Sequence, residues 1–273
     1  MNKVPTATVT PALWRGLRRF TDARIALGRA GVSQPTAAHL AFQLAHAQAR
    51  DAVHLPFDPT QLTEPLHALG LQALQLHSAA PDRITYLQRP DLGRRLDAGS
   101  VQTLQNWQQD QGTDTPPDLA FVIADGLSAH AAMQHALPLM TNLVKRLRED
   151  DTHRWTLAPV ALVEQGRVAI GDEIGALLHA RTVVVLIGER PGLSSPDSLG
   201  IYFTWAPRVG LSDAQRNCIS NVRDAGLPPE RAAGKLMALL RQARLRQITG
   251  IALKDEVDER LDPPLSGPQR LRP

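Results

Sequence analysis

The feature that most constrains the fold is a short apolar run, TVVVLI at residues 182–187, within a longer patterned stretch at 166–221. The run is too short for a typical helix and rich in β-branched residues, which predicts a strand buried on both faces. It stops at GERPG, a sequence that cannot continue a strand. We expect a helix before it, a second strand at 200–205, and then a helix that carries Cys218. This alternation predicts an open α/β sheet, in which ligands bind where strands end.

Apolar runs on both sides of this stretch extend the alternation of helices and strands. Strands are expected at 119–124 and 156–163, with a helix at 128–148 between them. A last helix is expected at 229–246, beginning with a proline, and residues 250–253 are expected to form a final short strand. The order predicts an α/β fold with a mostly parallel, Rossmann-like sheet and helices on both faces.

The first third of the chain contains no clear strand. Apolar residues at helical spacing predict helices at 35–52, 62–76 and 97–111, although Gly70 is unfavourable inside the second. We therefore predict a smaller helical N-terminal domain ahead of the sheet. The expected divisions are an N-terminal extension with a short amphipathic helix (1–22), a helical domain (23–112), an α/β ligand-binding domain (113–255) and a flexible tail (256–273).

The N-terminal extension contains the segment PALWRGLRRF at residues 11–20. As a helix it places Leu13, Trp14, Leu17 and Phe20 on one side and arginines on the other. A short basic amphipathic helix of this kind can dock on a partner or a surface. It is equally consistent with a first helix that packs on its own domain.

The composition excludes several classes of protein. The single cysteine permits no internal disulfide and favours a reducing compartment. No apolar run approaches the length of about 18 residues that a membrane span needs, and no secretory signal begins the chain, so we expect a cytoplasmic protein with no membrane partner. Although the net charge is +3, aromatic residues are only 4% of the chain, which argues against a nucleic-acid partner.

Two other residue types suggest sites that the sequence does not support. His39, His46 and His54 lie in or near one expected helix, but spacings of seven and eight residues do not match the i, i+4 pair of a helical metal site. We therefore predict no metal site. Cys218, the only thiol, is expected to be a small apolar side chain rather than a reactive group.

Acidic residues follow three of the expected strands: Asp125, Glu164 and Glu189. At the edge of an α/β sheet such carboxylates are expected to converge, and a pair of them can serve as acid and base. No nucleophile elbow, phosphate-binding loop or dinucleotide fingerprint accompanies them. The segment from Asp125 to Ser128 is also typical of a turn followed by a helix cap. Glu189 is the strongest binding candidate, because flanking glycines leave room for a large flat ligand.

The longer motifs resemble one known family. In family order, from Leu27 to Asp255, the chain contains LGRAGVSQPT, PDLGRRL, AFVIADGLSA, RVAIGDEIGALL, VVVLIGERPGLSSPDSLGIYFTWAPR, RNCISN and IALKD. Together these resemble the small (light) subunit of ethanolamine ammonia-lyase. The run GERPGLSSPDSLG is highly specific.

The resemblance implies an adenosylcobalamin-dependent lyase that converts ethanolamine to acetaldehyde and ammonia. In that family the large subunit binds ethanolamine and carries the catalytic residues, and cobalamin lies between the two chains, six copies of each forming the hetero-oligomer. The family's cobalamin contacts match Val168, Glu189 and Cys218 here, and no catalytic residue is expected on this chain. The α/β domain is thus expected to bind cobalamin. The resemblance also implies a place in a bacterial microcompartment where the organism makes one.

Two further expectations follow from the motifs. D-x-H-x-x-G, whose histidine replaces the nucleotide base on cobalt, does not occur in the sequence, so we expect cobalamin to bind base-on. The alternatives to a cofactor-binding subunit are a non-catalytic interaction subunit and a free-standing α/β enzyme that uses Asp125, Glu164 and Glu189. The matching motifs argue against the first, and the missing nucleophile, metal and phosphate motifs argue against the second.

Overall fold

A six-stranded sheet forms the centre of the computed structural model, which describes residues 9–111 and 115–253. Its strand order is β1-β3-β2-β4-β5-β6. The first four strands run parallel, whereas β5 is antiparallel to both of its neighbours. The mostly parallel sheet predicted from the sequence is therefore confirmed. The strands are β1 (Ala73–His77), β2 (Leu119–Ala124), β3 (Val160–Glu164), β4 (Thr182–Gly188), β5 (Leu199–Trp205) and β6 (Asn217–Val222).

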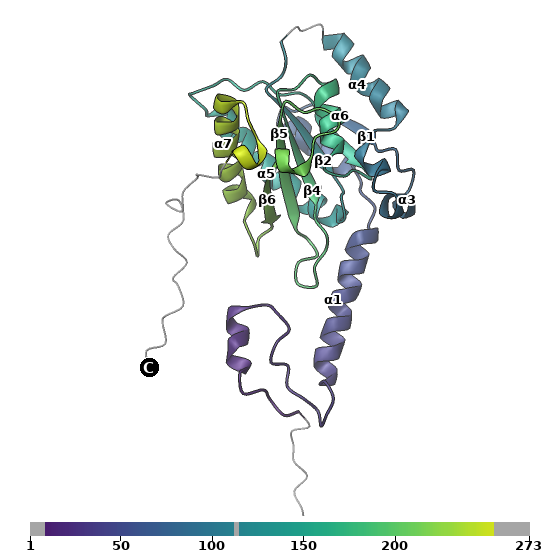
Figure 1. Ribbon diagram of the computed structural model, residues 1–273, viewed down its shortest axis with the longest axis vertical. Helices are drawn as coiled ribbons and strands as arrows, with labels where there is room; N and C mark the ends of the chain where they lie inside the picture. The colour runs from purple at the N-terminus through teal and green to yellow at the C-terminus, as the bar shows by residue number, and fades with distance from the viewer. Residues whose placement is uncertain (1–8, 112–114, 254–273) are drawn as a thin grey trace, which may run out of the picture.

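Helices cover both faces of the sheet, as predicted (Figure 1). One face packs against α5 (Ala129–Arg148) and α7 (Pro229–Arg246), and the other against α4 (Ala98–Gln111) and α6 (Ile170–Leu177). The remaining helices are α1 (Thr36–His54), α2 (Thr60–Ala68), α3 (Arg83–Gln88) and four short 3-10 helices, η1 (Arg15–Phe20), η2 (Leu92–Arg94), η3 (Asp213–Gln215) and η4 (Gly250–Ala252).

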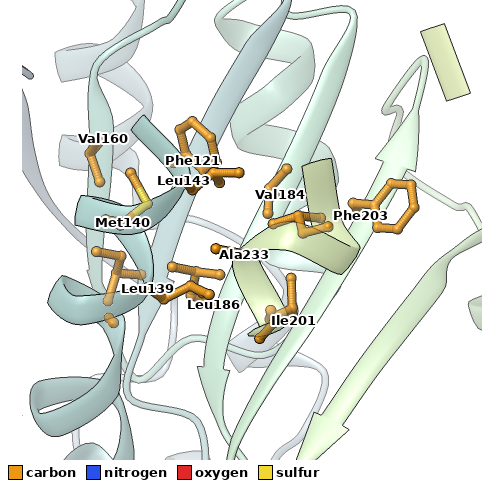
Figure 2. Packing of buried hydrophobic residues seen from close by; sticks show 14 of the residues in the cluster. Phe121, Leu139, Met140, Leu143, Val160, Val184, Leu186, Ile201, Phe203 and Ala233 are labelled. Atoms are coloured by element: carbon orange, nitrogen blue, oxygen red, sulfur yellow. The ribbon is translucent and has the colours of Figure 1, made fainter. Parts of the chain in front are cut away.

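The core follows from the two-residue period of the strands. Successive side chains of a strand point to opposite faces, and in β2 and β4 both sets are apolar and buried. Phe121 and Val184 meet α5 and α7 on one face (Figure 2), whereas Val122 and Val185 belong to the cluster on the α6 face. Each such side chain contributes roughly 1.5–3 kcal/mol through burial.

Because β2, β3 and β4 are parallel, the loops that follow them all lie where the carboxyl ends of these strands meet, here called the carboxyl edge of the sheet. The chain leaves β2 for α5 on one face and leaves β3 for α6 on the opposite face. Adjacent strands whose connections diverge in this way open a crevice at their carboxyl ends. This edge is where the fold positions its candidate site.

The predicted helix at 62–76 is wrong in its second half. Helix α2 ends at Ala68, and Gly70 then adopts a left-handed conformation (φ +72°) that ends helices. The chain continues into β1, which pairs with β3 at the edge of the sheet. The range 23–112 is therefore not purely helical, and its division from the α/β part stays a prediction.

The predicted helix around Cys218 is also wrong, because Cys218 lies in β6. Ser212 and Gln215 form a capping box at the start of η3. No longer helix follows, because the backbone is extended from Arg216 onward. Strand β6 then pairs with β5 along the sheet edge. Residues 250–252 form η4 rather than a strand. The division expected between residues 112 and 113 and the tail expected at 256–273 lie outside the described residues.

The N-terminal segment lies away from the sheet. In Figure 1, α1 projects from the body of the molecule, and η1 lies near the far half of α1. The predicted amphipathic helix is the 3-10 helix η1, which has no buried residue. Leu13, Trp14, Leu17 and Phe20 are all exposed. Arg24 connects the segment to the body by donating to the Leu193 carbonyl, in the loop between β4 and β5 (3.1 Å).

Candidate functional site

Two adjoining cavities meet at the carboxyl edge of the sheet, and the larger extends along the α6 face to the 209–213 loop, which follows β5 at the opposite edge. The smaller has a volume of about 290 Å³ and the larger about 700 Å³, and they share Arg167, Val168 and Tyr202. The smaller is also lined by Tyr86, Gly126, Leu127, Ile187, Gly188, Glu189 and Arg190. The larger is also lined by Asp91, Arg94, Arg95, Ala169, Asp172, Val209, Gly210, Leu211, Ser212 and Asp213.

Val168 lies in the loop between β3 and α6, on the boundary between the two cavities. Its carbonyl accepts a hydrogen bond from Gly171 in the first turn of α6 (3.2 Å), which holds the loop against the helix. The side chain is half-buried and packs on the apolar cluster of the α6 face. Val168 can therefore offer an apolar contact to a ligand in either cavity.

Glu189 follows β4 and lines the smaller cavity. Its Oε2 accepts hydrogen bonds from the Ser198 hydroxyl (2.5 Å) and from the Asn221 backbone N–H (3.3 Å). Among the described residues, no hydrogen bond reaches Oε1. The protein thus anchors one oxygen of the carboxylate and leaves the other as an acceptor for a ligand.

Cys218 lies in β6 directly opposite Tyr202 of β5, so both side chains are on the same face of the sheet. Tyr202 lines both cavities, whereas Cys218 is an exposed thiol beside it. Partial burial raises the pKa of the Cys218 thiol. A hydrogen bond with Tyr202 lowers that pKa by less, and the nearby Glu189 carboxylate raises it further. The thiol stays protonated at neutral pH, which fits a contact residue and not a nucleophile. Edge strand β6 leaves Cys218 exposed, so the side chain is not part of this chain's apolar core.

The three strand-end carboxylates do not converge on one cavity, so that expectation is wrong. Asp125 is buried and accepts hydrogen bonds from Arg83 (3.2 Å) and from the Gly166 backbone N–H (3.0 Å). Burial raises its pKa to about 6, although Arg83 opposes the shift. Glu164 lies in β3 opposite His77 and lines neither cavity. Of these three carboxylates, only Glu189 lines a cavity.

The predicted turn and cap after Asp125 are confirmed. The Ser128 hydroxyl accepts a hydrogen bond from the Ala131 backbone N–H (3.2 Å) and caps α5. Gly126 has φ +57°, and a Cβ there would lie 2.2 Å from the Gly188 carbonyl oxygen. The close approach of these loops defines the floor of the smaller cavity.

Sequence reasoning missed an aromatic centre, Tyr86, on the wall of the smaller cavity. Its ring contacts two guanidinium groups, those of Arg83 (4.7 Å) and Arg167 (4.5 Å). Its hydroxyl donates to the Gly166 carbonyl (3.1 Å). The chain has only two tyrosines, and both line this cavity. That scarcity was the one signal in the sequence that could have directed attention to Tyr86 and Tyr202.

A buried ion pair supports the larger cavity. Asp172 of α6 accepts two hydrogen bonds from Arg216 (2.5 and 2.7 Å), and both side chains are 2% exposed. Arg216 also donates to Thr204 of β5 (3.2 Å) and the Leu211 carbonyl (3.0 Å). Through its hydrogen bond to the Leu211 carbonyl, Arg216 holds the 209–213 loop in place. Breaking the Asp172–Arg216 pair would leave an uncompensated buried charge.

Within residues 9–111 and 115–253, no group of three or more His, Cys, Asp or Glu side chains is arranged to hold a metal ion. None of the helices there combines the length and the apolar character that crossing a bilayer requires.

Comparison with known proteins gives a consistent result. A family model described as "Ethanolamine ammonia-lyase light chain" matches residues 11–254. A protein from Azotobacter vinelandii named ethanolamine ammonia-lyase small subunit is 62% identical over 263 residues, or 96% of this chain and 95% of that protein. Proteins of the same name are 61% identical in Ralstonia nicotianae (92% of each chain) and 59% identical in Pseudomonas aeruginosa (90% of this chain and 88% of that one).

Proposed function

Since the chain belongs to the ethanolamine ammonia-lyase light chain family and is thus a subunit of an ammonia-lyase, we propose that it contributes to binding adenosylcobalamin. The enzyme converts ethanolamine to acetaldehyde and ammonia. In this proposal the cofactor lies between this chain and a catalytic large subunit that binds ethanolamine. The α/β part, residues 113–255, is the cobalamin-binding part.

One observation carries the proposal. Val168 and Glu189, which come from different loops, line the same cavity at the carboxyl edge of the sheet. Tyr202 is on the wall of that cavity, and Cys218 lies beside Tyr202. The matching family motifs identified these three residues. Val168 and Glu189 line one cavity and Cys218 is next to it, in the region where open α/β sheets bind ligands, which supports a shared role in binding.

The residues around the cavities fit a corrin-containing cofactor. Such a group is large and flat, with apolar faces and amide side chains at its rim. Val168, Leu127 and Tyr202 offer apolar contact, and Glu189 Oε1 offers a hydrogen-bond acceptor for an amide N–H. Because both cavities lie at the surface of the chain, the remainder of the cofactor would contact the large subunit.

Each residue has a limited role in this arrangement. Val168 packs against an apolar part of the cofactor, Glu189 accepts a hydrogen bond from an amide or the nucleotide loop, and Cys218 makes a contact as a neutral thiol. Bound adenosylcobalamin supplies the radical chemistry, and the protein supplies position and exclusion of water. None of the three residues makes or breaks a bond.

Base-on binding belongs to the same proposal. The described residues that line the two cavities include no histidine that could replace the nucleotide base on cobalt. We expect the electron-spin-resonance spectrum of the cob(II)alamin state to show nitrogen splitting from the cofactor's own base. Splitting that changes when the histidines of this chain are labelled with nitrogen-15 would contradict it.

The assembly and its location complete the proposal. Six copies of this chain with six large subunits form the enzyme, in the cytoplasm or inside a microcompartment. The exposed apolar residues of η1, Leu17 and Phe20, give the N-terminal segment the character of a targeting helix.

The experiment that tests the function compares adenosylcobalamin absorbance with this chain alone, the large subunit alone, and both together, before and after adding ethanolamine. We expect only the mixture to retain cofactor and to produce acetaldehyde. If the large subunit alone retains cofactor and turns over fully, this chain is a non-catalytic accessory subunit without direct cofactor binding.

A further inference from the structure

Two arginines that the proposed function does not use lie on the wall of the larger cavity, Arg94 at the end of η2 and Arg167 between β3 and α6. Their segments are joined directly, because the Arg167 backbone N–H donates to the Gly93 carbonyl (2.7 Å). Gly93 permits this contact: a Cβ there would lie 3.0 Å from Arg167 Cγ and from the Tyr86 ring. The fold thus brings the two side chains to the same wall.

Most other charges around the cavities are neutralised within the chain. Asp172 and Asp213 pair with Arg216, Asp91 pairs with Arg89, and Glu173 pairs with Arg95. Across the described residues, Arg94 has no ion pair and is exposed, and Arg167 Nε is buried with no hydrogen-bond partner. Because Asp172 and Asp213 share the single Arg216, these groups together leave the larger cavity with an excess of one positive charge, and Arg94 and Arg167 carry it.

We propose that Arg94 and Arg167 bind the phosphodiester of the cofactor's nucleotide loop, so that this chain selects corrinoids that carry a complete nucleotide tail. The inference rests on the proposed function. The phosphodiester is the only anionic substituent of cobalamin, whose corrin side chains are neutral amides. Guanidinium groups present donors in a fork that matches two phosphate oxygens. The positive wall and the single anion of the cofactor are thus complementary.

The smaller cavity is the poorer place for this anion. Its one further cation, Arg190, is next in sequence to Glu189, whose carboxylate lines the same cavity. A phosphodiester there would meet that carboxylate, and like charges repel. The arrangement therefore places the corrin rim near Glu189 and the nucleotide tail across Val168, toward Arg94.

The test measures dissociation constants by absorbance titration of the reconstituted two-subunit complex. The ligands are cyanocobalamin and a cobinamide, which lacks the phosphate, ribose and base. For Arg94→Gln we expect affinity for cyanocobalamin to fall about tenfold, the loss typical of one charge-assisted hydrogen bond, and affinity for the cobinamide to be unchanged. Arg94→Lys, which keeps the charge, should recover part of the loss. Inorganic phosphate should compete with cyanocobalamin in the wild type and not with the cobinamide.

Each outcome separates this inference from the proposed function. Arg154→Gln, an exposed arginine before β3 and so at the opposite edge of the sheet, is the control and should bind both ligands as the wild type does. Equal affinity of Arg94→Gln and wild type for cyanocobalamin, or a tail-dependent loss in Arg190→Gln instead, would overturn the inference alone. A wild-type complex that binds cyanocobalamin no better than the large subunit does would overturn the proposed function itself.

Discussion

At the scale of single residues, the two carboxylate oxygens of Glu189 have different roles, one in the fold and one in the cavity. Oε2 is held by Ser198 and Asn221, and Oε1 is left for a ligand. Glu189→Gln keeps the size of the side chain and an acceptor oxygen but removes its charge. We expect cobalamin to bind the reconstituted enzyme about tenfold more weakly, with little change in the free energy of unfolding.

Titrations of corrin absorbance and denaturant unfolding would measure these two effects. Glu149→Gln, at the exposed carboxyl end of α5, is the matched control and should change neither. An unaltered dissociation constant for Glu189→Gln would remove Glu189 from the binding site.

Gly126 tests the floor of the smaller cavity. It has φ +57°, and an added Cβ would lie 2.2 Å from the Gly188 carbonyl oxygen and 2.5 Å from Ile187 Cγ1. Gly126→Ala should therefore cost about 2–4 kcal/mol of unfolding free energy, through backbone strain and overlap with β4. Urea denaturation would measure the loss. Gly99→Ala in α4, where a Cβ meets only ordinary contacts, should be neutral or slightly stabilising; equal costs for the two variants would contradict this account.

At the scale of elements, Asp150 connects the end of α5 to α7. It is buried and accepts hydrogen bonds from Arg241 (3.0 and 3.2 Å), Thr152 (2.6 Å) and Trp155 (2.7 Å). Burial alone would raise the pKa of Asp150, but these hydrogen bonds outweigh burial and hold that pKa well below its usual value. The ionised form is thus the one that stabilises the fold.

The depressed pKa of Asp150 makes the stability of the fold depend on pH. A carboxyl whose folded-state pKa is depressed stabilises the protein above its unfolded pKa, near 4, and loses that contribution as the pH falls below it. At pH 7 the wild type should exceed Asp150→Asn by about 2 kcal/mol in unfolding free energy, and the difference should shrink steadily below about pH 4. Chemical denaturation across pH 3–7 would measure it, with exposed Asp151→Asn as control. A difference that grows toward low pH would be the contrary result.

The sequence predicted elements well where the periodic pattern was long. Helices α5 and α7 and the uniformly apolar strands β2 and β4 were located closely, because burial on both faces leaves no polar position in a strand. The prediction from sequence failed for β1 and β6, the two outermost strands of the sheet. Each has polar and apolar residues mixed over five or six positions, and pairing with a neighbour, not its own composition, makes it a strand.

The candidate site was predictable only in part, for the same kind of reason. Glu189 was identified because it follows the most apolar strand. Val168 and Cys218 came from the family motifs. Tyr86 and Arg94 lie far from β4 in the sequence, and they reach the cavities through long-range contacts such as those of Gly93 with Arg167 and of Tyr86 with Gly166.

At the scale of the whole molecule, the N-terminal segment is separable from the body. Helix η1 buries no residue, and Arg24, which contacts the loop after β4, lies beyond it. Deleting residues 1–20 should therefore leave the midpoint of thermal unfolding within about 2 °C of the wild type. It should also change the distribution of the chain in shell-forming cells, observed with a fluorescent fusion. A lower midpoint by more than about 5 °C, or an unchanged distribution, would count against separability or targeting respectively.

We propose that this chain covers part of the cofactor with the two cavities that meet at the carboxyl edge of its sheet. The most direct measurement is a structure of the reconstituted two-subunit enzyme with cyanocobalamin bound. We predict density for the corrin against Val168 and Glu189, beside Tyr202 and Cys218, with the base still on cobalt. Cobalamin enclosed wholly by the large subunit, with this edge facing solvent, would contradict the claim.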